Sequence, residues 1–143
     1  MSDSESTSDA TLESELQADQ IERARQIVEA ALEVKAERPV ALNVREVTSF
    51  ADILVVLSGR SDRQVRGIVD AIRVALRAQG EKPLAIEGYG EGRWVLIDLS
   101  DVIVHVFTPE VRERYDIERL WSDAKPIDLE IEELEDASAD TAS

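Results

Sequence analysis

Cysteine is absent from this 143-residue chain, and histidine occurs once, as His105. Without cysteine there is no disulfide framework and no thiolate metal site, and one histidine with carboxylates alone does not make a zinc site. We therefore predict no metal and no cofactor. No apolar run approaches the roughly eighteen residues of a membrane span, and the first residues lack the basic and apolar regions of a secretory signal. These absences predict a soluble cytoplasmic protein without a membrane partner.

Basic residues are also scarce. Lysine and arginine number 16 against 31 aspartates and glutamates, which gives a formal net charge of −15. Residues 1–20 contain six acids and no base, and residues 122–143 contain eight acids and one lysine, leaving 17 acids against 15 bases in residues 21–121. Such acidic ends are typical of solvated, disordered tails. The alternative is that they steer the domain toward a basic partner and away from bare nucleic acid.

The chain between these ends is long enough for one hydrophobic core and too short for two. Hydrophobic residues make up 43% of the sequence, an ordinary share for a globular protein. We predict one domain at 19–122 between disordered acidic tails at 1–18 and 123–143.

Apolar residues recur at helical and strand spacings along this domain. Asp19 can cap a first helix, and Ser61 with Gln64 forms a capping box for a second. Thr108 precedes Pro109, which suits the first turn of a third helix. The predicted helices cover 20–36, 62–79, a short stretch from Pro109 and 116–121; the predicted strands cover 40–44, 53–57, 84–87, 93–98 and 102–107, and Pro126 bounds the ordered part. This order predicts an α/β fold with a mixed five-stranded sheet flanked by helices. The strand at 53–57 is apolar throughout, which predicts burial on both faces.

A loop with three glycines, Gly88, Gly90 and Gly92, is one candidate for phosphate binding. It lies between two predicted strands, so it lacks the oriented amides and the helix dipole that hold a phosphate. A flexible hairpin loop is the simpler interpretation.

A second candidate is the turn Gly59-Arg60-Ser61, which leads into a helix as the glycine–serine turn of a nucleotidyltransferase does. Such an enzyme would add paired aspartates to hold Mg²⁺, and Asp98 and Asp101 are the candidates for that pair. They flank the turn of the hairpin predicted at 93–107, where convergence on one ion is not favoured, and Asp101 is well explained as a turn former.

His105 lies on the strand 102–107, where alternation places Ile103, His105 and Phe107 on one side. A partly buried histidine bonded to a neighbour is the default interpretation. A catalytic base would need a nucleophile or an orienting acid within reach, and the spacing identifies none. We therefore predict that the protein is not an enzyme.

Residues 94–121 contain both tryptophans, the histidine and Tyr115. Trp94 opens a strand beside the glycine loop, and Trp121 ends a helix just before the acidic tail. Either ring can fill core, but both positions favour partial exposure, and aromatic residues are enriched among those that anchor protein–protein contacts.

Four motifs in order resemble the ribosomal silencing factor family, also called the Iojap family, across about residues 20–122. They are FADILVVLSGRS at 50–61, the Glu87-Gly88 loop, WVLIDLSDVIVHVF at 94–107 and YDIERLW at 115–121. The two acidic tails are not part of this resemblance.

The resemblance implies an α/β domain distantly similar to the nucleotidyltransferase fold but without its catalytic acids, and a homodimer in the free protein. It also implies a translational repressor that binds the large ribosomal subunit through ribosomal protein number fourteen. Bound there, it would sterically block joining of the small subunit when nutrients are short. The contact region implied here is Trp94, Val95 and Leu96, with Tyr115 and Trp121 as further candidates. The alternatives are a nucleotidyltransferase-like enzyme and a plain dimerisation module.

Overall fold

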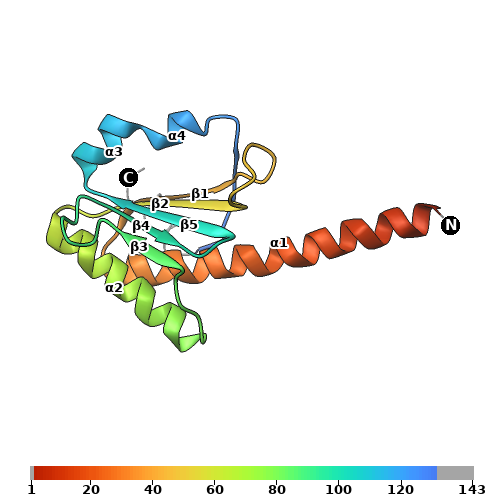
Figure 1. The fold of residues 1–143 in the computed structure, drawn as a ribbon, viewed down its shortest axis with the longest axis horizontal. Helices are drawn as coiled ribbons and strands as arrows, with labels where there is room; N and C mark the ends of the chain where they lie inside the picture. Colours follow the sequence, from red (N-terminus) through yellow and green to blue (C-terminus); the bar gives the residue numbers. More distant parts are fainter. Residues whose placement is uncertain (1, 132–143) are drawn as a thin grey trace, which may run out of the picture.

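The computed structural model describes residues 2–131, with side chains described from Ala18 onward. A six-stranded sheet lies between two helical layers (Figure 1). Helices α1 (Ser2–Glu33) and α2 (Asp62–Ala78) cover one face, and α3 (Pro109–Tyr115) and α4 (Ile117–Leu120) lie over the other. The strands are β1 (Glu37–Asn43), β2 (Ile53–Ser58), β3 (Ala85–Glu87), β4 (Trp94–Asp98), β5 (Val102–Phe107) and β6 (Lys125–Pro126). In the described part of the chain, no helix is long and apolar enough to cross a membrane.

The sheet has the strand order β3-β4-β5-β2-β1-β6. β2 and β5 pair in parallel, and every other neighbouring pair is antiparallel, including the predicted β4–β5 hairpin. An α/β fold with a mixed sheet flanked by helices is therefore confirmed. The predicted number of five strands is wrong, because β6 adds a sixth strand beside β1.

The two parallel strands form the centre of the core. Every residue of β2 and of β5 is buried, which confirms the two-sided burial predicted for 53–57. Along β5, alternate side chains enter different halves of the core. Val102, Val104 and Val106 pack with α1 and α2, whereas Ile103 and Phe107 face the layer of α3 and α4.

Helix α2 begins with the predicted cap. The Ser61 hydroxyl accepts a hydrogen bond from the Gln64 amide at 3.1 Å. The Gln64 side chain does not reach back to the Ser61 amide as in an ideal capping box, because its oxygen accepts from the Arg60 amide at 2.7 Å. The buried face of the helix has the predicted members: Val65, Ile68, Val69, Ile72 and Leu76.

Helix α1 is longer than predicted at its beginning. It starts at Ser2, not at the expected cap Asp19, so that residues 2–18, predicted to be a disordered tail, are helical. Neither proline nor glycine occurs in this segment, and no residue there stops a helix. The later part of α1 packs on the sheet through Ala24, Ile27, Val28 and Ala31. The beginning of α1 extends well beyond the edge of the sheet (Figure 1).

The first strand also starts earlier than the predicted residue 40. β1 begins at Glu37 and contains an irregularity between Glu37 and Val40, which brings Pro39 into the strand. A bulge tolerates proline because the extra residue makes no ladder hydrogen bond.

The folded chain continues past residue 122, the predicted end of the domain. After β6, Leu129 and Ile131 are buried in the core shared with α1 and α2, at 6% and 5% exposure. Apolar and acidic residues alternate strictly through 127–131, a strand-like signal that the overall acidity of the segment hides. Pro126 therefore does not bound the ordered part, and the rest of the predicted tail, 132–143, lies outside the described residues.

Candidate partner-binding site

Trp94 lies at the start of β4, opposite Phe107 of β5. Its ring is partly buried and packs among three aromatic rings. The centroid separations are 5.2 Å to Phe107, 5.9 Å to His105 and 4.8 Å to Tyr115. The predicted partial exposure of Trp94 is confirmed, and its ring is held in place on the sheet.

Gly88 allows the chain to approach Trp94 closely. Its φ is +84°, a left-handed conformation, and a Cβ at this position would collide with the Trp94 carbonyl oxygen. The three-glycine loop that follows is tied to α2, because the Tyr89 hydroxyl donates to Asp70 at 3.0 Å. In the structure this loop fixes the start of β4.

Leu96 and Val95 follow Trp94 but point to opposite faces of the sheet. Leu96 is partly exposed on the same face as Trp94, where it pairs with His105. Val95 is 0% exposed and packs in the core toward α1 and α2. Val95 was predicted to contact a partner, and that prediction is wrong because its side chain cannot reach the surface.

Tyr115 ends α3 and joins this surface from a different element. It is 54% exposed although its ring packs against Trp94 at an interplanar angle of 42°. α3 stops there because Asp116 adopts a left-handed conformation, with φ of 43°. We call Trp94, Leu96, His105 and Tyr115 together the Trp94 surface.

The helical layer of α3 and α4 leaves this edge of the sheet uncovered. Ala85 and Glu87 of β3, which pair with Asp98 and Leu96, are exposed on the same face. Charged residues of both signs flank the Trp94 surface: Arg93, Arg114, Glu87 and Asp98. Among the described residues, these charges do not form the predominantly acidic rim that would favour a basic partner.

His105 is the titratable ring beneath this surface that is buried, with 6% of its area exposed. Its Nδ1 accepts a hydrogen bond of 2.9 Å from the Trp94 indole Nε1. Burial lowers the pKa of the imidazole from 6.5 to about 4, so the ring is neutral at physiological pH. The interpretation of His105 as a histidine bonded to a neighbour is confirmed.

Trp121 does not join the Trp94 surface. It is partly buried at the end of α4, and its aromatic neighbour is Phe50, at 6.0 Å and an interplanar angle of 69°. Phe50 is 61% exposed, and Leu120, which precedes Trp121 in the chain, is 74% exposed. We call Phe50, Leu120 and Trp121 the Phe50 surface. Phe50 and Leu120 were not predicted as site residues, because their only signal in the sequence is a large apolar residue in a polar segment.

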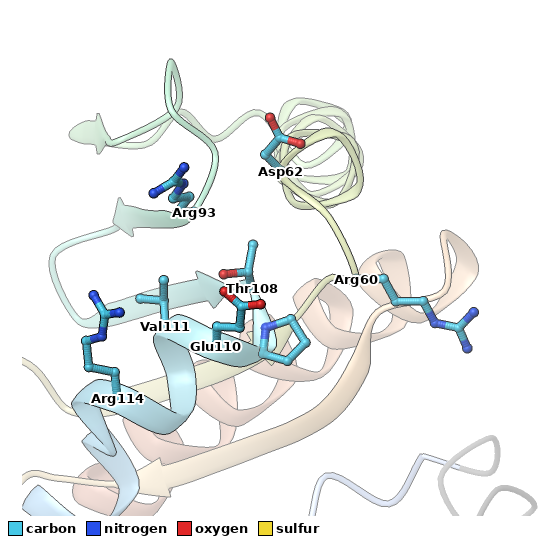
Figure 2. A pocket seen from close by; sticks show the side chains of 8 residues that line it. Arg60, Asp62, Arg93, Thr108, Glu110, Val111 and Arg114 are labelled. Atoms are coloured by element: carbon cyan, nitrogen blue, oxygen red, sulfur yellow. The ribbon is translucent and has the colours of Figure 1, made fainter.

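The glycine–serine turn that suggested a nucleotidyltransferase lies beside a pocket of about 480 Å³. Arg60, Asp62, Arg93, Thr108, Pro109, Glu110, Val111 and Arg114 line it, at the ends of β2 and β5 (Figure 2). The Arg60 side chain points away from the other labelled residues and forms an ion pair with Glu37.

Asp98 and Asp101 are not at this pocket. Asp98 pairs with Ile103 at the beginning of β5, whereas the pocket lies at the far end, beyond Phe107. The length of β5 separates the two positions by about 16 Å. Asp98 accepts from the Ser100 amide at 2.8 Å, and Asp101 forms an ion pair with Arg23 at 2.6 Å. The two halves of the predicted nucleotidyltransferase site therefore do not meet.

Comparisons with known proteins agree on one family. The sequence profile described as "Ribosomal silencing factor during starvation" matches residues 17–143. Ribosomal silencing factor RsfS of Halalkalibacterium halodurans is 42% identical over 103 residues, which cover 72% of this chain and 88% of that protein. RsfS of Bacillus subtilis strain 168 is 40% identical over 96 residues, 67% of this chain and 81% of that protein.

Solved structures and more distant relatives extend the similarity. A crystal structure of a Chromobacterium violaceum protein superposes with a TM-score of 0.69 at 37% identity, covering 71% of this chain and 84% of that one. A Mus musculus protein named mitochondrial assembly of ribosomal large subunit protein 1 is 29% identical over 76 residues, 51% of this chain and 33% of that protein.

Proposed function

The chain belongs to the ribosomal silencing factor family, and from this membership we propose that it represses translation by binding the large ribosomal subunit. The proposed contact is ribosomal protein number fourteen, on the face of the subunit that meets the small subunit. The name of the mouse relative, which refers to the ribosomal large subunit, supports this choice of partner. We propose that the protein acts in the cytoplasm, most strongly when nutrients are short.

The Trp94 surface is the observation that supports a binding function most directly. It places a tryptophan, a leucine and a tyrosine from two different elements on an uncovered edge of the sheet. Partly exposed aromatic residues held in fixed positions bind a partner at a low cost in side-chain entropy. Because the flanking charges are mixed, we expect affinity to depend on these apolar contacts more than on net charge.

The proposed mechanism involves no turnover. A folded domain seated at the subunit interface occupies volume that the small subunit needs, so repression follows from affinity and competition. The distant likeness to nucleotidyltransferases that the sequence resemblance implies stays a prediction. The separation of Asp98 and Asp101 from the Gly59–Ser61 turn weighs against the enzymatic alternative.

We propose that the free protein is a homodimer and that the Phe50 surface forms its interface. Self-association interfaces are rich in apolar side chains, and Phe50 and Leu120 are the most exposed aromatic and aliphatic residues around Trp121. Sedimentation velocity should show a dimer for the wild type and a monomer for Leu120→Asp. If Leu120→Asp stays dimeric but loses affinity for the large subunit, the roles of the two surfaces are reversed.

The main experiment is co-sedimentation with purified large ribosomal subunits, followed by measurement of subunit joining. Leu96→Asp places a charge within the Trp94 surface and should weaken binding at least tenfold. Leu84→Asp is the matched control, because Leu84 is 72% exposed and lies among the residues of α2 and β3 on the opposite face. The control should bind and repress like the wild type.

Two results would contradict these proposals in different ways. Wild-type protein that neither sediments with large subunits nor affects joining at micromolar concentration excludes the repressor function. Wild-type protein that binds while Leu96→Asp binds equally well leaves the function intact and excludes the Trp94 surface as the contact.

A further inference from the structure

The hydrogen bond between Trp94 and His105 fixes which imidazole nitrogen carries the proton. An indole N–H can only donate, so His105 Nδ1 must accept and therefore has no proton. Since the ring is neutral, its one N–H is on Nε2. Parallel stacking on Phe107, with centroids 5.7 Å apart and planes at 6°, holds the ring in this orientation.

Among the described residues, the His105 side chain makes one hydrogen bond, the one from Trp94, and none of them offers the Nε2–H group an acceptor. It is also not shielded from solvent. His105 Nε2 is not one of the described side-chain atoms that are shielded from solvent and also lack a hydrogen bond. The small exposed fraction of His105 therefore leaves a donor in contact with water.

The surroundings of this donor are apolar. His105 pairs with Leu96 across the β4–β5 ladder, and the Trp94 ring lies against it. A partner that covered Trp94, Leu96 and Tyr115 would remove water from Nε2–H. A donor that loses water without gaining an acceptor destabilises the complex, so a well-fitting partner must bring an acceptor to this point.

We propose that His105 Nε2–H is a specificity-determining donor that binds a carbonyl oxygen of the partner at the centre of the Trp94 surface. This inference rests on the proposed function and deepens it. A neutral carbonyl, from the main chain or an amide side chain, fits better than a carboxylate. Removing water from a carboxylate beside Trp94 and Leu96 costs more free energy than a hydrogen bond from the uncharged imidazole returns.

The first test is of the tautomer in the free protein. Long-range ¹H–¹⁵N correlation spectra of ¹⁵N-labelled full-length protein should show the protonated nitrogen at Nε2 and an unprotonated Nδ1. A proton on Nδ1 would overturn the inference whatever the protein binds.

The second test compares three variants in large-subunit co-sedimentation. His105→Phe keeps a flat ring beside Phe107 but has neither the Nε2 donor nor the acceptor for the Trp94 N–H, and should weaken binding about five- to tenfold. His105→Gln can place an amide N–H near the position of Nε2 and should recover most of that loss. Ile103→Val, on the same face of β5 and 9% exposed, is the control for a change in packing alone and should bind like the wild type.

The outcomes separate this inference from the function on which it rests. Wild-type binding that His105→Phe leaves unchanged overturns the role of His105 alone. Equal losses in His105→Phe and Ile103→Val also overturn it, because packing would then account for the effect. A wild type that does not bind large subunits overturns the proposed function and this inference together.

Discussion

Replacing Trp94 with alanine tests how one side chain can serve both the fold and a partner. The mutation removes a partly buried ring that contacts Phe107 and Tyr115 and donates a hydrogen bond to His105. Loss of a fully buried aromatic side chain costs about 3–5 kcal/mol, so partial burial gives about 2 kcal/mol. The lost hydrogen bond adds about 1 kcal/mol. We expect a total destabilisation of about 3 kcal/mol.

This loss should leave the domain folded. Domains of this size are stable by about 5–15 kcal/mol, so Trp94→Ala retains a positive free energy of unfolding. In urea, with a slope of about 2 kcal/mol per molar, the midpoint should fall by about 1.5 M without a change in cooperativity. The folded variant should then bind large subunits at least tenfold more weakly, because a tryptophan anchor is worth about 2 kcal/mol or more.

Two further variants serve as controls for this prediction. Trp94→Phe keeps a ring but removes the N–H, and should lose about 1 kcal/mol of stability. Tyr115→Ala removes a mostly exposed ring, so its urea midpoint should stay close to that of the wild type while its binding weakens. Loss of the cooperative transition in Trp94→Ala would show that Trp94 is a core residue. A variant with unchanged midpoint and unchanged binding would refute both roles.

Three other predictions concern positions around this surface. Val95→Ala should cost about 2–3 kcal/mol in urea unfolding, because the side chain is fully buried, and should leave large-subunit affinity unchanged; weaker binding would restore Val95 as a contact. Gly88→Ala should cost about 2–4 kcal/mol and also weaken binding, since a Cβ there displaces the Trp94 carbonyl; a melting curve like that of the wild type would contradict this. The pKa of His105 is about 4 in the folded protein against 6.5 in the unfolded chain. The stability that comes from burying the neutral imidazole is therefore fully present above pH 6.5 and is lost as the pH falls toward 4. This loss of folding free energy reaches about 3 kcal/mol. The urea midpoint of His105→Phe should therefore fall less on acidification than that of the wild type. Equal falls in the two proteins would exclude the lowered pKa of His105.

Much of the fold could be predicted because its signals are local. Helix α2 and strands β2, β4 and β5 each have an apolar pattern of the right period within a few residues of sequence. The structure of the two ends of the chain was predicted less well. Acidity along 123–131 suggested a solvated tail, yet Leu129 and Ile131 are buried because β6 pairs with β1 and brings them under the sheet.

The candidate site was predicted less well for a related reason. Val95 and Leu96 are adjacent in sequence and equally apolar, but only the position of the helical layers decides which face is covered. Trp121 is a rare aromatic residue in the sequence, as Trp94 is, yet its ring packs against Phe50 and does not belong to the Trp94 surface. Proximity in sequence therefore did not separate Trp94, Leu96 and Tyr115, which share one surface, from Val95 and Trp121, which do not belong to it.

By itself, the sequence determined the helices, the central strands and the family of this protein, because capping residues, apolar periodicity and motif order are properties of neighbouring residues. Only the tertiary structure decided that Tyr115 packs against Trp94, that Val95 is buried and that His105 Nδ1 accepts a hydrogen bond from Trp94. These facts depend on strand register and on where α3 packs, which are set by contacts between segments far apart in the chain.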